Sequence, residues 1–97
     1  MASAPRQYTL SQAAMADLDD IYAYGLEHWG FRQAEAYQDA IFLTFDALAD
    51  GRAHTRPLID AYRKASVGSH FVIYREDETT VFVVRVLHQQ MDVERRL

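Results

Sequence analysis

The spacing of the apolar residues changes once along the chain, and this change limits the folds that the sequence can adopt. Between residues 12 and 51 the apolar residues recur every three or four positions, as in an amphipathic helix. Between residues 62 and 88 they recur with a period of two, as in β-strands. Helices followed by a run of strands predict an α+β domain, with the helices on one face of a mostly antiparallel sheet.

The helical part divides into two helices at a glycine. Ser11 is a favourable N-cap for a helix whose apolar positions run through residues 14–29. Gly30 supplies a C-terminal stop, and a second set of apolar positions occupies residues 34–48. Gly51 ends this second helix. Because the connection is so short, we predict an antiparallel helical hairpin.

Strands surround this hairpin in the predicted order β-α-α-β-β-β. A loop is predicted at residues 52–61, and a last helical turn is predicted after Asp92. We expect residues 1–5 to be frayed and residues 1–97 to form one domain. The predicted strands cover residues 7–10, 62–67, 70–75 and 80–88.

The last two strands are apolar on both faces. Strict alternation places one set of side chains on the first face: Val72, Tyr74, Phe82, Val84 and Val86. It places the remaining set on the second face: Phe71, Ile73, Arg75, Val81, Val83, Arg85 and Leu87. Two helices can cover only one face, so the other is expected to be an apolar patch with two arginines. Such patches mark interaction surfaces, and we therefore predict a protein partner.

The charge of the chain differs between its two halves. The net charge of −4 disfavours nucleic acid or an anionic membrane as the partner. Residues 1–51 contain two basic and eight acidic side chains, whereas residues 52–97 contain eight basic and six acidic ones. The basic residues could be paired surface charges, or they could form a cationic concavity for phosphate or an acidic protein segment. Seven of these eight basic residues form the set in question: Arg56, Arg63, Lys64, Arg75, Arg85, Arg95 and Arg96.

The residue types argue against cofactor chemistry. The chain has no cysteine, which excludes disulfides, thiolate nucleophiles and cysteine-ligated zinc. The four histidines show no i, i+4 pair and the four glycines form no phosphate-binding loop, so we expect neither a metal nor a cofactor. Residues 68–70 (Gly-Ser-His) are better interpreted as a hairpin turn than as a nucleophile and its base. With no membrane-length apolar run and no secretory signal, a cytoplasmic location is expected.

Motifs in both halves of the chain resemble those of one bacterial family. The second half contains G-S-H-x-x-x-Y-R at residues 68–75 and R-V-L-H-x-x-M-D at residues 85–92. The first half contains Y-x-L-S at residues 8–11 and A-D-L-x-x-I-x-x-Y at residues 16–24. Together they resemble the ParE toxins of the RelE/ParE superfamily, over residues 8–97.

The resemblance implies a toxin of a type II toxin–antitoxin pair, held in a hetero-oligomer by a ParD-like antitoxin. Characterised ParE toxins act on DNA gyrase, whereas their RelE relatives cut messenger RNA on the ribosome. A non-catalytic gyrase inhibitor is favoured for this chain, because ribosomal nucleases of the fold tend to be basic. Two alternatives stay open: a RelE-like endoribonuclease, and an inactive copy that only binds the antitoxin.

Three sets of residues are expected to serve catalysis, target binding and antitoxin binding. If the chain is a nuclease, its catalytic groups are expected to be Arg63, Lys64, Arg85 and His88. Contacts with the target are expected at Arg75, Arg85, His88, Arg95, Arg96 and Leu97. Contacts with the antitoxin are expected at Phe71, Ile73, Val81, Val83, Asp17 and Asp20.

Overall fold

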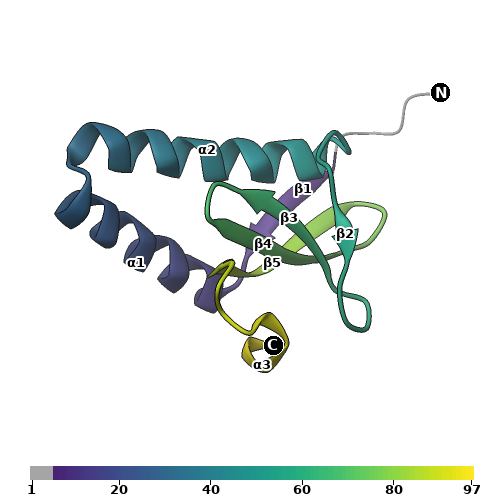
Figure 1. Cartoon of the computed structure of the whole chain (residues 1–97). Helices are drawn as coiled ribbons and strands as arrows, with labels where there is room; N and C mark the ends of the chain where they lie inside the picture. The colour runs from purple at the N-terminus through teal and green to yellow at the C-terminus, as the bar shows by residue number, and fades with distance from the viewer. Residues whose placement is uncertain (1–5) are drawn as a thin grey trace.

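Two helices lie on one face of a five-stranded sheet in the computed structural model of the chain (Figure 1). The structure describes residues 6–97, so the predicted frayed segment at residues 1–5 lies outside it. The elements in chain order are β1 (Gln7–Leu10), α1 (Gln12–His28), α2 (Phe31–Ala49), β2 (Arg56–Pro57), β3 (Arg63–Val67), β4 (His70–Glu76), β5 (Thr80–His88) and α3 (Val93–Arg96). The α+β class, the helical hairpin and the last helical turn are confirmed.

The strands follow the order β1-β5-β4-β3-β2 across the sheet. β1 lies parallel to β5, and the other three neighbouring pairs are antiparallel, which confirms the mostly antiparallel sheet. β2 was not predicted, because two residues carry no alternation. Pro57 is tolerated there because β2 is an edge strand. One side of an edge strand pairs with no other strand, so a residue without a backbone N–H can be accommodated.

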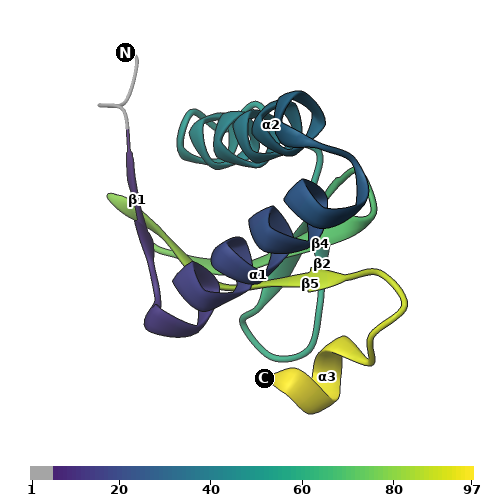
Figure 2. The same ribbon diagram turned by 90° about the vertical axis from the view of Figure 1, so that its left-hand side faces the viewer.

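Ser11 begins α1 and also joins it to the sheet. Its Oγ accepts the backbone amide of Ala14 at 3.0 Å, which is the predicted N-cap bond. The same hydroxyl donates to the carbonyl oxygen of Val84 at 2.7 Å. The start of α1 is therefore fixed against β5, and α1 packs along that strand (Figure 2). No helix within residues 6–97 combines the length and the apolar content that a membrane crossing requires.

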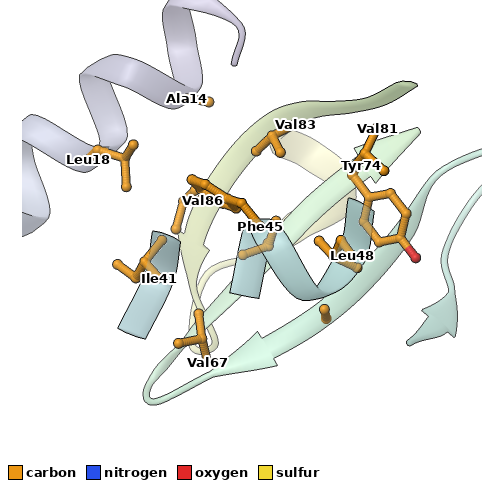
Figure 3. Packing of buried hydrophobic residues seen from close by; sticks show 12 residues of the cluster. Ala14, Leu18, Ile41, Phe45, Leu48, Val67, Tyr74, Val81, Val83 and Val86 are labelled. Carbon is orange, nitrogen blue, oxygen red and sulfur yellow. The ribbon is translucent and has the colours of Figure 1, made fainter. Parts of the chain in front are cut away.

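The main core lies between the helices and the sheet, with side chains from both layers pointing toward one another (Figure 3). Full burial of one such aliphatic or aromatic side chain stabilises a fold by about 1.5–3 kcal/mol. The most deeply buried members are Ala14, Leu18, Ile41, Phe45, Leu48, Ala65, Val72, Tyr74, Val81, Val83 and Val86.

A β-bulge overturns the predicted division of the two sheet faces. The register between β4 and β5 shifts between Ile73 and Tyr74, which leaves Val84 as an extra residue on β5. The extra residue moves the alternation by one position. Val81 and Val83 therefore face the helices and are 0% and 1% exposed, so the prediction that they lie on the uncovered face is wrong.

The second face of the sheet is also partly covered. Ile73, Leu87 and Val93 form a second buried cluster, and Leu58 and Tyr62 pack against it. Val93 belongs to α3, which lies on the opposite side of the sheet from α2 (Figures 1 and 2). The expectation of a bare apolar face is therefore wrong, because α3 and the loop before β3 cover its centre.

Candidate functional site

Arg85, expected to contact the target or to act in a nuclease, is bound to a carboxylate of α1. Its Nε and Nη2 donate to the two oxygens of Asp17 at 2.8 and 2.9 Å. Asp17 also accepts the backbone amide of Val86 at 2.9 Å, and Nη1 of Arg85 donates to the carbonyl oxygen of Arg96 at 3.3 Å. The hydrogen bonds that Arg85 donates to Asp17 raise the pKa of Arg85. These two side chains therefore join α1, β5 and α3.

The four residues of the nuclease hypothesis each have a different neighbour. Arg63 lies 3.9 Å from the carboxylate of Glu76. The Nζ of Lys64 lies 4.5 Å from the centre of an aromatic ring, and Nδ1 of His88 accepts a backbone amide at 3.1 Å. Within residues 6–97, no hydrogen bond or ion pair joins any of these three to another or to Arg85. The fold thus forms no acid–base pair from this set.

The residues expected to contact the target lie at different places along the sheet. His88 pairs with the first residue of β4, whereas Arg75 comes near the end of that strand. The guanidinium carbon of Arg75 lies 5.6 Å from the ring centre of Tyr62. Arg95 of α3 forms an exposed ion pair with Asp92, the residue before α3, and Leu97 follows at the exposed end of the tail. The tail residues are therefore neighbours, while His88 and Arg75 lie at opposite ends of β4.

Only part of the set expected to contact the antitoxin is accessible. Ile73 is fully buried, as are the two valines already placed in the main core. Asp17 is occupied by Arg85. Phe71 is half-buried, and Asp20 is exposed on α1. Asp20 and Phe71 are thus the members that a partner could reach without a change in the fold.

A hydrogen-bonded network joins α2 to the turn between β3 and β4. The expected hairpin turn at Gly68 and Ser69, followed by His70 as a strand residue, is confirmed. The hydroxyl of Tyr37 lies 2.6 Å from Nδ1 of His70 and accepts the backbone amide of Ser69 at 2.9 Å. Burial raises the pKa of Tyr37. Burial also lowers the pKa of His70; the charge of His88 lowers it further, and Asp17 opposes the shift.

A hollow of about 600 Å³ opens beside this network, between α1 and the paired ends of β4 and β5; we call it the α1 hollow. Tyr24 and Trp29 line it and are 53% and 45% exposed. Asp20 supplies a carboxylate to the lining, and His70 and His88 supply imidazole rings. Aromatic surface with a few polar groups is typical of a pocket that receives an anchoring side chain of a protein partner.

The aromatic side chains of the α1 hollow were not predicted as part of a site. Trp29 follows the apolar period of residues 14–29, which predicts a buried side chain, yet nearly half of it is exposed. Tyr24 falls among the polar positions of the same helix. The sequence signal for this site is Tyr24 itself, because a large aromatic residue on the polar side of an amphipathic helix indicates a contact surface.

The other ion pairs of the described residues lie apart from the Asp17–Arg85 pair and do not converge on one centre. Arg6 binds Glu76, and Arg52 binds Asp50 at 2.8 Å. Within residues 6–97, no three side chains of the metal-ligating types come together in a group that could hold a metal ion.

A family model and two proteins similar in sequence carry the same description, that of a ParE toxin. Residues 8–93 match the model of a family described as the ParE toxin of type II toxin–antitoxin system, parDE. The chain is 45% identical over 98 residues to Toxin ParE1 of Mycobacterium tuberculosis, a match that covers 94% of this chain and 97% of that protein. It is 38% identical over 95 residues to Toxin ParE1 of Caulobacter vibrioides, covering 95% and 98% of the two chains.

Solved structures with the same fold are more distant in sequence. A chain of the chromosomal ParDE TA system from P. aeruginosa superposes with a TM-score of 0.76 at 18% identity, covering 87% of this chain and 96% of that one. A chain of the RelBE2 toxin–antitoxin complex from Mycobacterium tuberculosis gives a TM-score of 0.61 at 22% identity, covering 90% and 94%. At these identities the similarity establishes a shared fold.

Proposed function

Because this chain belongs to the ParE family and is the toxin component of a type II toxin–antitoxin system, we propose that it inhibits DNA gyrase by direct binding, without nuclease chemistry. The toxin–antitoxin complexes among its structural relatives support an antitoxin as its first partner. The proposal therefore concerns two contacts, one with a ParD-like antitoxin and one with gyrase.

The observation that carries the non-catalytic mechanism is the Asp17–Arg85 ion pair. An RNA-cleaving site needs cations free to stabilise charge at the scissile phosphate. The guanidinium of Arg85, the central cation of the nuclease hypothesis, is compensated by a bidentate carboxylate. To release it, the fold has to leave the mostly buried carboxylate of Asp17 without its cation, which is costly. The net charge of −4 adds repulsion from an RNA-rich target.

We place the antitoxin contact at the α1 hollow. Its exposed aromatic side chains, Tyr24 and Trp29, offer area for an apolar anchor, and Asp20 offers a partner for a flanking Lys or Arg. Residues 1–51 carry a balance of −6, which suits a basic segment. A ParD-like segment with an apolar residue between basic ones therefore matches this surface in both shape and charge.

Tyr24→Ala tests that contact, because the side chain is exposed and supports little of the core. We expect the variant to weaken binding of the cognate antitoxin by about tenfold, as measured by calorimetry on the full chain. Phe31→Ala is the matched control, since Phe31 is 65% exposed and does not line the hollow. Equal affinities of the two variants for the antitoxin would show that the antitoxin does not bind at the α1 hollow.

We place the gyrase contact on the basic second half, at Arg75, His88 and the tail residues Arg95, Arg96 and Leu97. Arg85 leaves this set because Asp17 already holds it. The exposed ion pair between Arg95 and Asp92 is weak in water, so Arg95 can exchange Asp92 for a carboxylate of the target at little cost.

The mechanism is tested by inducing the chain in cells without its antitoxin. We expect broken chromosomal DNA together with intact messenger RNA, and we expect co-expressed antitoxin to restore growth. Cuts within translated messages that disappear in Arg85→Ala or His88→Ala would establish the nuclease alternative instead. Normal growth in the presence of folded toxin would identify an inactive copy.

A further inference from the structure

Two cations face each other across the β2–β3 pair with no anionic partner among the described residues. Arg56 and Lys64 are direct partners in this antiparallel register, so their side chains lie on the same face of the sheet. Neither forms an ion pair within residues 6–97. The Nζ of Lys64 lies over the ring of Phe71, 4.5 Å from its centre. Like charges directly opposite destabilise a strand pair, so an external anion would relieve this one.

Both cations line a second hollow, of about 820 Å³, between α2 and the outer edge of β3; we call it the β3-edge hollow. Leu43 and Ala47 of α2 form an apolar wall, and Leu43 is 65% exposed. Among the described residues that line this hollow there is no Asp or Glu, although acidic residues outnumber basic ones in the chain, 14 to 10. The hollow is therefore a local positive site in a net negative protein.

β3 presents an open strand edge in the same hollow. β2 pairs only with the first two residues of β3, so the sheet ends at the remainder of β3. The two-residue turn makes Val67 and His70 a hydrogen-bonded pair. Antiparallel pairing alternates, so the N–H and C=O of Ser66 point away from β4, beyond the end of β2. An added strand could bond to these two groups.

We propose that the β3-edge hollow binds an acidic, extended segment of a protein partner. The backbone of the segment continues the sheet at Ser66, its carboxylates pair with Arg56 and Lys64, and its apolar side chains contact Leu43 and Ala47. A polypeptide fits better than a nucleic acid, because an open strand edge bonds a peptide backbone and an apolar wall receives aliphatic side chains. The site does not depend on gyrase being the target.

The probe is a blocked eight-residue peptide that alternates Glu and Val, titrated into the isotopically labelled full chain and followed by amide chemical shifts. We expect saturable shifts at Ser66, Arg56 and Leu43. A peptide that alternates Lys and Val has the same length and strand propensity with the opposite charge, and it should produce no saturable shifts there. Inorganic phosphate and an octauridylate are titrated in parallel.

The double variant Arg56→Gln/Lys64→Gln should weaken the Glu peptide by about tenfold. The control Arg32→Gln/Arg52→Gln removes the same charge from cations outside the hollow, and it should change affinity less than about twofold. Arg56→Gln alone should not lower the melting temperature, because it removes a like-charge opposition, so its loss of binding cannot be ascribed to unfolding.

Three results would overturn the proposal. Equal affinity of the Glu peptide for the two double variants would show that Arg56 and Lys64 do not contribute to its binding. Shifts of the same residues with phosphate alone, at similar concentration, would reduce the hollow to a simple anion site. Tighter binding of the octauridylate than of the peptide at these residues would make it a nucleic-acid surface.

Discussion

The carboxylate of Asp17 and the guanidinium of Arg85, 68 positions apart in the chain, form a bidentate ion pair at 2.8 and 2.9 Å. The pair lies where β1 has ended and the edge of β5 is open. Asp17 satisfies the Val86 amide on that edge, at 2.9 Å, and thus acts as a short substitute for the missing strand. Asp17 was expected to contact the antitoxin, and Arg85 was expected to contact the target. In the structure the two side chains instead connect α1 to β5.

Asp17→Ala should destabilise the chain by about 1–3 kcal/mol, because it leaves the Val86 amide and the Arg85 guanidinium without their acceptor. Urea denaturation measures this as a loss in the free energy of unfolding. Asp19→Ala is the control: the side chain is exposed two positions away, and the change should stay within about 0.5 kcal/mol. Equal losses for the two variants would show that the ion pair contributes nothing to stability.

Val83→Asp and Phe82→Asp, at adjacent positions of β5, should behave in opposite ways. Val83 is 1% exposed and faces the helices, so a carboxylate there costs more than about 4 kcal/mol and should unfold the chain. Phe82 is 41% exposed on the other side of β5, so Phe82→Asp should leave the fold intact. Circular dichroism during thermal unfolding separates them. A folded Val83→Asp would show that the bulge does not shift the alternation.

The pattern of apolar residues is sufficient to predict most of the fold. The helical hairpin follows from the period of three to four, and Ser11 caps α1 as a short polar residue at that position should. The bulge at Val84 escapes such reasoning, because strict alternation assumes that no strand carries an extra residue. Its consequence is large: one inserted position moves Val81 and Val83 from the expected interface into the core.

The candidate sites are harder to predict than the fold, because their residues come from distant segments. The Asp17–Arg85 pair and the α1 hollow each join helix and sheet residues, and no local spacing connects them. The opposed cations Arg56 and Lys64 depend on β2, a strand too short to show alternation. Charge counting alone did identify the basic second half.

The stability of the chain should fall as the pH drops below neutrality, in part because of His70. Burial lowers its pKa in the folded chain from the usual 6.5. The unfolded chain therefore binds a proton that the folded chain does not, so the free energy of unfolding decreases as the pH falls through 6.5 toward the lowered pKa. His70→Gln should reduce this decrease, measured by urea denaturation between pH ~7.5 and ~5.5.

His54→Gln is the matched control for the pH experiment. His54 is exposed, and its substitution removes one imidazole without changing the hydrogen bonds of Tyr37. It should keep the pH dependence of the unmodified chain. If His70→Gln also keeps that dependence unchanged, the burial of His70 does not contribute to it.

Supercoiling of relaxed plasmid by purified DNA gyrase, with increasing amounts of the purified full chain, tests the central proposal most directly. We predict that supercoiling is lost, that linear DNA accumulates once gyrase is removed by protease and detergent, and that an excess of antitoxin prevents both. Messenger RNA on translating ribosomes should stay intact at the same toxin concentration. Unchanged supercoiling at a saturating concentration of folded toxin would contradict the proposal.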